Sequence, residues 1–281
     1  MPIIGAHVSA ASGLYHAFEN AKSIGARAIQ IFGASPRQWV GKFPEHGDIE
    51  RFKKDYSASN IAYVFLHAPY LANLASPNPF VVKQSIASLI LHLKIAEAIG
   101  AQGLIFHPGS GKGMENKKAL KQVSDNMKKA LKAVPGKSEL IIENTAGGGN
   151  KVGATLQDLE DMLKGAKSPR VKICFDTAHA YEAGLIEEYT QKNIKKLFDA
   201  FDKAIGLDKL SAIHANDSKT PMNSHNDRHE NIGKGYIGIA GFKNLAKEKR
   251  LHSIPFILEV PGYSQEGPDK KNIDILSSCF L

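Results

Sequence analysis

The sequence predicts a TIM, or (β/α)8, barrel in which residues 1–281 form one α/β domain. Short, continuous apolar runs recur eight times, as expected of parallel strands that are buried on both faces. Amphipathic stretches separate these runs, and a barrel of this kind takes about 250 residues. The alternative is an open doubly wound sheet, but no G-x-G-x-x-G fingerprint follows the first run, which weakens that alternative.

The expected strands and helices alternate along the chain. Each expected strand is a short apolar run, and the runs cover residues 3–8, 28–32, 62–66, 103–106, 140–142, 171–175, 211–213 and 256–258. Each expected helix has an amphipathic pattern, and these stretches cover residues 13–24, 48–57, 79–99, 116–133, 155–164, 187–205 and 240–249. No internal repeat or low-complexity segment interrupts the order.

Composition excludes several classes of protein. The hydrophobic fraction of 43% and the charged fraction of 23% are those of an ordinary globular chain, not of a disordered or collagen-like one. No run approaches the roughly 18 apolar residues of a membrane span, and no secretory signal opens the sequence, so we expect no membrane partner and a cytoplasmic location. Cys174 and Cys279 are far apart, which leaves a disulfide framework and a thiolate zinc site unsupported. Cys174 lies in an apolar run and reads as a small core residue.

The charge balance favours a polyanionic partner. Lysine and arginine total 36 against 28 acids, a net charge of +8 with a pI near 9.2. A basic surface of this kind favours nucleic acid first, although many basic proteins bind none. The lysines of residues 116–133 fit the solvated outer face of a helix better than a binding stripe.

Residues of metal-ligand type follow nearly every expected strand. Chemistry in a barrel collects at the carboxyl ends of its strands, and the side chains found there or in the loop after the seventh strand are His67, His107, Glu143, Asp176, His179, His214, Asp227, His229 and Glu259. Taken singly, each fits a structural histidine, a helix cap or a salt-bridge partner. Their shared placement is the argument, because chance would scatter them onto helix faces.

The chemistry of this donor set points to bound metal. All nine are nitrogen or oxygen donors, which suit zinc, manganese or iron, and five histidines with four carboxylates exceed the needs of one ion. Two or three ions with bridging carboxylates fit better, and such clusters serve hydrolysis of phosphate esters. Four acids so close would repel each other without cations, so the cluster implies metal unless the acids lie apart.

An ordered series of motifs resembles the endonuclease IV family of apurinic/apyrimidinic DNA endonucleases. The similarity runs from about residue 3 to about residue 262, and its motifs are Gly5-Ala6-His7-Val8-Ser9, Arg37-Gln38-Trp39, His67-Ala68-Pro69-Tyr70, His107-Pro108-Gly109, Glu143-Asn144-Thr145-Ala146-Gly147, Asp176-Thr177-Ala178-His179, His214-Ala215-Asn216-Asp217-Ser218-Lys219, Asp227-Arg228-His229 and Ile232-Gly233-x-Gly235-x-Ile237-Gly238. Each motif alone is weak to moderate, but the series is highly specific.

The resemblance implies a TIM barrel that carries three zinc ions. The implied ligands are His67, His107 and Glu143 for the first ion, Glu143, Asp176, His214 and Glu259 for the second, and His179, Asp227 and His229 for the third. Glu143 and Glu259 are also the implied catalytic residues. The implied reaction cleaves the phosphodiester 5′ to an abasic site in double-stranded DNA, leaving a 3′-hydroxyl and a 5′-deoxyribose phosphate, and it also removes blocking groups from 3′ ends.

The resemblance also implies how DNA is held. Arg37, Tyr70 and Leu71 are the implied DNA-binding residues, which fill the gap at a site without a base. We expect a monomer, because that suits a protein that must wrap DNA. The sequence departs from the family at Gly148, Ala178 and Asn223, where glutamine, cysteine and glycine are usual, and this affects loop geometry more than chemistry.

Two alternatives stay open. A sugar isomerase or epimerase on the same barrel would need only Glu143, Asp176, His214 and Glu259, but it leaves the other five donors without a purpose. A non-catalytic, metal-stabilised DNA-binding module would have closed coordination with no position for water.

Overall fold

The computed structural model describes residues 2–36, 38–39 and 41–281, and these form a closed barrel of eight parallel strands. Around the barrel the strand order is β1-β10-β7-β6-β5-β4-β3-β2. The strands are β1 (Ile4–His7), β2 (Ala28–Phe32), β3 (Tyr63–His67), β4 (Gly103–Phe106), β5 (Glu139–Glu143), β6 (Val171–Asp176), β7 (Leu210–His214) and β10 (Phe256–Leu258). The predicted fold class is therefore confirmed.

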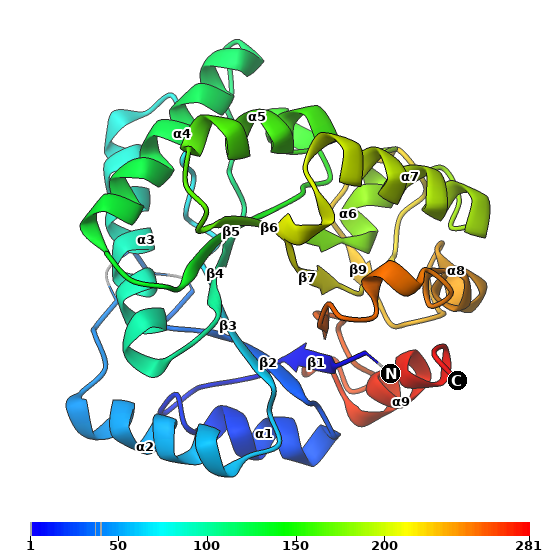
Figure 1. The fold of residues 1–281 in the computed structure, drawn as a ribbon, viewed down its shortest axis with the longest axis horizontal. Helices are drawn as coiled ribbons and strands as arrows, with labels where there is room; N and C mark the ends of the chain where they lie inside the picture. Colours follow the sequence, from blue (N-terminus) through cyan, green and yellow to red (C-terminus); the bar gives the residue numbers. More distant parts are fainter. Residues whose placement is uncertain (1, 37, 40) are drawn as a thin grey trace.

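Helices form the outer ring of the barrel (Figure 1). They are α1 (His16–Ile24), α2 (His46–Ala58), α3 (Pro79–Ile99), α4 (Asn116–Ala133), α5 (Leu156–Ala166), α6 (Thr177–Glu182), α7 (Gln191–Ala204), α8 (Gly238–Leu245) and α9 (Lys270–Ser278). The bounds of α3 and α4 are those predicted. At α3 the reason is local: Asn78 Oδ1 accepts a hydrogen bond from the Phe80 amide, Pro79 opens the helix, and Gly100 ends it with φ 75°.

Two helices and one short hairpin were not predicted. Helix α6 has six residues and starts because the Asp176 carboxylate accepts a hydrogen bond from the His179 amide at 2.8 Å; it is too short to show a helical period. Helix α9 follows the last strand, and the Asp269 side chain caps it. Strands β8 (Asp217–Ser218) and β9 (His229–Glu230) form a two-stranded antiparallel hairpin beyond β7.

The interior of the barrel is filled by one small apolar cluster. Its members are Ala28, Phe65, Ile105, Ile141, Cys174, Ala212 and Ile257, each from a different strand. Side chains along a strand alternate between the two faces, so the residue two positions later also points inward. Burial raises the pKa of the Cys174 thiol to about 12, which fits the predicted role of a small core residue.

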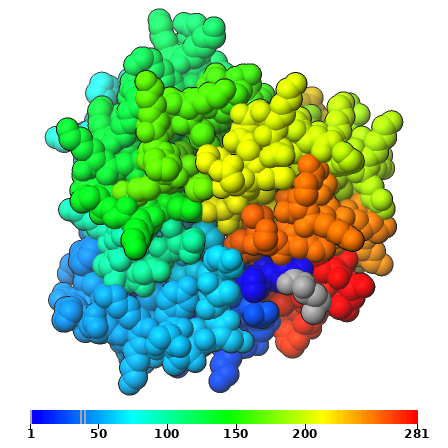
Figure 2. Space-filling model, in the orientation of Figure 1, coloured from blue at the N-terminus to red at the C-terminus, as the bar shows by residue number. Residues whose placement is uncertain are grey.

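Helix α3 is, within the described residues, the one helix long and apolar enough by length and composition to cross a membrane. Its buried side chains include Ser85, Leu89 and His92, and it lies against α2, α4 and the strands β3 and β4. These contacts are those of a helix that packs on a barrel. On the opposite side of the ring, the blue N-terminal segment lies beside the red C-terminal helix α9 (Figure 2).

Candidate metal centre

The barrel carries its polar side chains at the carboxyl ends of the strands, directly above the inner apolar cluster. His67, Glu143, Asp176 and His214 are the last residues of β3, β5, β6 and β7, and His107 and Glu259 come directly after β4 and β10. All six lie two residues beyond a member of the inner cluster, and each therefore points inward at the mouth. His179 is on α6, and Asp227 and His229 lie on the β8–β9 hairpin or just before its second strand.

Glu143 is the centre of this arrangement and is fully buried. Its Oε2 lies 3.1 Å from Nε2 of His67 and 2.9 Å from Nε2 of His107. Its Oε1 lies 3.0 Å from Nδ1 of His214 and 3.2 Å from Nδ1 of His179. One carboxylate therefore faces donors from both sides, which is the geometry of a bridging ligand.

The donor atoms form three groups, in each of which all atoms lie within 4.8 Å of one another. The groups are His67, His107 and Glu143; Glu143, Asp176, His214 and Glu259; and Asp176, His179 and His229. Asp227 joins the third group, because its Oδ1 lies 3.1 Å from Nε2 of His179 and 3.9 Å from Nε2 of His229. The structure thus brings together all nine residues that the sequence singles out.

Outer hydrogen bonds orient the imidazoles toward the cluster. His67 Nδ1 lies 2.8 Å from the carbonyl oxygen of Ala68, and His179 Nδ1 lies 2.9 Å from that of Asn144. When Nδ1 donates a hydrogen bond outward, Nε2 faces inward with a free lone pair. His214 is turned the other way: its Nε2 lies 2.7 Å from Oε1 of Gln30, and its Nδ1 faces Glu143.

Two buried imidazole nitrogens indicate that the cluster fits a cation. Nε2 of His179 and Nε2 of His229 are buried and have no hydrogen-bond partner among the described residues. Both face carboxylate oxygens, at 3.1 Å for Asp227 and 3.6 Å for Asp176. A buried acceptor without a donor is costly, and a divalent cation would satisfy it. Imidazole with carboxylate is among the donor sets that bind zinc, so these residues fit that metal.

The charges of the cluster also favour a bound cation. Burial raises the pKa of Glu143, but the neighbouring His107 and His214 outweigh burial and hold the pKa well below its ordinary value. Burial and His214 act in the same opposed way on Glu259, whose pKa is also well below its usual range. The lowered pKa values of Glu143 and Glu259 favour their ionised forms, which need positive charge close by, from protonated histidines or from bound cations.

Two residues at this site carried no assigned role in the sequence analysis. Gln30 is fully buried on β2, and its Nε2 donates a hydrogen bond to Oε1 of Glu259 at 2.5 Å. His7, the last residue of β1, places Nδ1 3.3 Å from the same oxygen. The signal for Gln30 was present as a single polar residue inside an apolar run, and His7 lay within a quoted motif.

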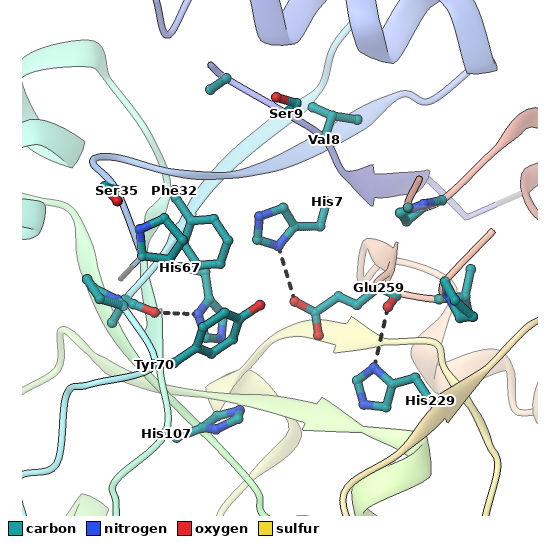
Figure 3. A pocket seen from close by; sticks show the side chains of 18 of the residues that line it. His7, Val8, Ser9, Phe32, Ser35, His67, Tyr70, His107, His229 and Glu259 are labelled. Carbon is teal, nitrogen blue, oxygen red and sulfur yellow. Dashed lines mark hydrogen bonds and ion pairs between the residues drawn. The ribbon is translucent and has the colours of Figure 1, made fainter. Parts of the chain in front are cut away.

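The cluster opens into a cleft of about 1230 Å3. In Figure 3, the side chains of His67, His107, His229 and Glu259 point into it, and the ring of Tyr70 lies at its wall. Tyr70 is 72% exposed and Leu71 is 37% exposed, so both lie on the surface beside the cleft. Arg37 lies outside the described residues. The DNA contacts predicted for these residues remain predictions.

Cationic side chains also line the cleft. They are Lys151, Lys219 and Arg228. Lys151 follows the loop after β5, and its Nζ donates a hydrogen bond to Oδ2 of Asp227 at 3.1 Å, while Oδ1 of the same carboxylate faces His179. The sequence does not single out Lys151, because nothing in its spacing indicates that two separate loops come together.

Two of the three departures from the family pattern, Gly148 and Asn223, have a local explanation. A Cβ on Gly148 would lie 2.2 Å from the carbonyl oxygen of His225, so the missing side chain lets the loop of residues 220–226 pack closely. Asn223 in that loop has φ 59°, a left-handed conformation that asparagine tolerates better than most residues. Ala178 is fully buried in α6.

The chain is similar to known proteins in both sequence and fold. Residues 18–279 match the family described as xylose isomerase-like TIM barrel. The chain is 35% identical over 285 residues to a probable endonuclease 4 of Aquifex aeolicus, covering 100% of this chain and 98% of that protein. It superposes on the crystal structure of endonuclease IV from Thermus thermophilus with a TM-score of 0.87 and 34% identity, covering 99% and 98% of the two chains. The chain belongs to the endonuclease IV family.

Other solved structures share the fold of this endonuclease IV family member at lower similarity. A D-tagatose 3-epimerase-like protein superposes with a TM-score of 0.72 at 19% identity, covering 99% of this chain and 97% of that one. Identity at this level shows the barrel alone, because one fold hosts many activities.

Proposed function

We propose that this protein is a DNA repair endonuclease that hydrolyses the phosphodiester 5′ to an abasic site, leaving a 3′-hydroxyl and a 5′-deoxyribose phosphate. The same site would remove blocking groups from 3′ ends of double-stranded DNA. The observation that carries the proposal is the convergence of five imidazoles and four carboxylates at the mouth of a barrel whose relatives include endonuclease IV. A monomer in the cytoplasm fits this role.

The proposed cofactor is zinc, with three ions in the three donor groups. His67, His107 and Glu143 would hold the first, Glu143, Asp176, His214 and Glu259 the second, and His179, Asp227 and His229 the third. When bound, such ions lower the pKa of a water molecule and neutralise charge on phosphate oxygens.

The protein's own groups would set the geometry of the reaction. Glu143 is fixed from both sides, with one oxygen toward His67 and the other toward His214, so it spans the first two groups without moving. Glu259 Oε2 lies 3.1 Å from Nδ1 of His214, and Gln30 holds its other oxygen. Both carboxylates are thus pre-oriented toward the mouth before any substrate arrives, which is what transition-state stabilisation requires.

The cleft supplies the remaining contacts to DNA. Lys151, Lys219 and Arg228 are positioned to neutralise phosphate oxygens on the way into the site. Tyr70 and Leu71 would enter the base stack, where an abasic site leaves room and costs least to extrude. The net charge of +8 adds a general attraction for DNA.

One assay tests the proposal. A duplex oligonucleotide with a single abasic site is incubated with the protein, with and without a chelator. The product ends are mapped, and DNA binding and the metal content per chain are measured on the same preparation. We expect one nick 5′ to the lesion, a 3′-hydroxyl end, and no nick after chelation. Tight binding without a nick would support the metal-stabilised binding module instead. No binding, together with one metal equivalent per chain, would favour the sugar isomerase.

A further inference from the structure

The segment after the β8–β9 hairpin is wrapped around a single buried carboxylate, that of Asp217. Asp217 is fully buried, and no Lys, Arg or His of residues 2–36, 38–39 and 41–281 lies within ion-pair distance of it. Its carboxylate instead accepts hydrogen bonds from five backbone amides. They are Ser218 at 2.9 Å, Gly233 at 2.9 Å, Gly235 at 3.0 Å, Ile237 at 2.9 Å and Gly238 at 3.2 Å.

This arrangement explains the glycine pattern of residues 233–238, to which the proposed function assigns no role. Gly233 and Gly238 have φ of 79° and 68°, in the left-handed region that favours glycine. A Cβ on Gly235 would lie 2.2 Å from the Ser218 carbonyl oxygen and 2.6 Å from Oδ1 of Asp217. Glycine-rich loops that point several amides inward are built to bind anions, and here the anion is part of the chain.

The same carboxylate is linked to the hairpin that carries two of the candidate ligands. Asp217 pairs with Glu230 in the β8–β9 ladder, and Ser218 pairs with His229. The Lys219 amide donates to the Arg228 carbonyl oxygen at 2.8 Å. β9 is therefore tied to β8 twice, by the ladder itself and by the loop after β9, whose amides return to Asp217 on β8.

We propose that Asp217 is a positioning residue that acts as the internal anion of the 233–238 loop. By gathering the five amides, its carboxylate sets the hairpin so that Asp227 and His229 face His179. It touches neither substrate nor metal and acts through the backbone alone. The part of this inference that concerns the third cation rests on the proposed function, while the part that concerns the loop does not.

Two variants and a matched control test the inference. Asp217→Ala removes the carboxylate. Asp217→Asn keeps the size of the side chain but replaces the charged acceptor with a neutral carboxamide, whose NH2 group cannot accept from the backbone amides. Thr190→Ala removes the side-chain cap of α7 away from the hairpin and serves as a control for general destabilisation. Hydrogen exchange of the backbone amides is measured for each folded variant. The zinc equivalents that each chain retains after dialysis are measured as well.

We expect amides 233–238 to exchange roughly 10- to 100-fold faster in both Asp217 variants, because a hydrogen bond to a charged acceptor changes an equilibrium by about that factor. We also expect the loss of one zinc equivalent, and its return in Asp217→Ala when formate is added to fill the space. Unchanged exchange, or the same losses in Thr190→Ala, would overturn the inference. If the wild-type protein holds no zinc, the proposed function fails, and the exchange rates still decide the role of Asp217.

Discussion

The replacement Gln30→Leu tests whether side chains outside the donor set control the metal centre. Gln30 touches the second donor group twice: its Oε1 lies 2.7 Å from Nε2 of His214, and its Nε2 donates to Oε1 of Glu259. Leucine has a similar volume and fills the same space, but it can neither accept nor donate a hydrogen bond. The variant therefore removes the orientation of His214 and Glu259 and leaves the ligands themselves in place.

The size of the effect follows from these two bonds. A hydrogen bond to a charged group contributes about 1.5–3 kcal/mol, and each 1.4 kcal/mol is roughly a tenfold change in an equilibrium constant. We therefore expect zinc to bind the second group about 10- to 100-fold more weakly. Loss of an outer partner of a metal ligand usually costs about the same factor, so the two estimates agree.

Stepwise zinc affinity is measured by competition with a chromophoric chelator. The matched control is Gln122→Leu, because the Gln122 side chain makes two hydrogen bonds, to the carbonyl oxygens of Leu74 and Ser76, and none to a candidate ligand. We expect the control to lose some thermal stability and to keep its zinc affinity. Equal zinc affinity in Gln30→Leu and the wild-type protein would refute the reasoning. An equal loss of zinc affinity in Gln30→Leu and Gln122→Leu would mean that general destabilisation, and not the orientation of His214 and Glu259, causes the effect.

Three further outcomes are expected. Glu143→Gln should abolish cleavage of an abasic duplex and leave its binding largely intact, and unchanged turnover would remove the bridging role of Glu143. Lys151→Met should weaken DNA binding and reduce the slope of log K against log salt by about 0.9, as expected for one lost phosphate contact; a slope equal to that of the wild-type protein would place Lys151 away from the backbone. Tyr70→Ala, measured in the Glu143→Gln background, should weaken binding of an abasic duplex by about 1–3 kcal/mol, the range for one stacked base, and a loss of the same size on intact duplex would argue against insertion at the lesion.

The strands and the convergence of the donor residues at their ends could be predicted because both follow from local rules. A strand buried on both faces is a continuous apolar run, and the carboxyl ends of parallel strands in a barrel meet at one mouth. His67, Glu143 and His214 each end such a run, so their convergence needs no knowledge of how distant loops pack. The eight predicted runs match the eight barrel strands to within one or two residues at each end.

What escaped prediction depends on contacts between segments far apart in sequence. Asp217 read as a simple turn or cap residue, yet it is fully buried because a loop about 20 residues later folds over it. Lys151 meets Asp227 only because the loop after β5 and the hairpin share one side of the cleft. Glu182 is similar, since its Oε1 accepts hydrogen bonds from Ser218 and from the Arg228 amide. No spacing within the sequence predicts these long-range contacts.

The third donor group is built from elements that the barrel strands do not themselves dictate. Glu143, Asp176, His214 and Glu259 lie at strand ends, where any barrel of this fold can place them, and four such residues suit one metal and a small substrate. The donors beyond that set at the third group come from the short helix α6 and from the β8–β9 hairpin, which the strands do not dictate. Asp217 and its five amides fix that hairpin. Three of the five donors that argue for a nuclease over an epimerase therefore lie in elements added to the barrel strands, and the hairpin that carries two of them is held by a buried carboxylate.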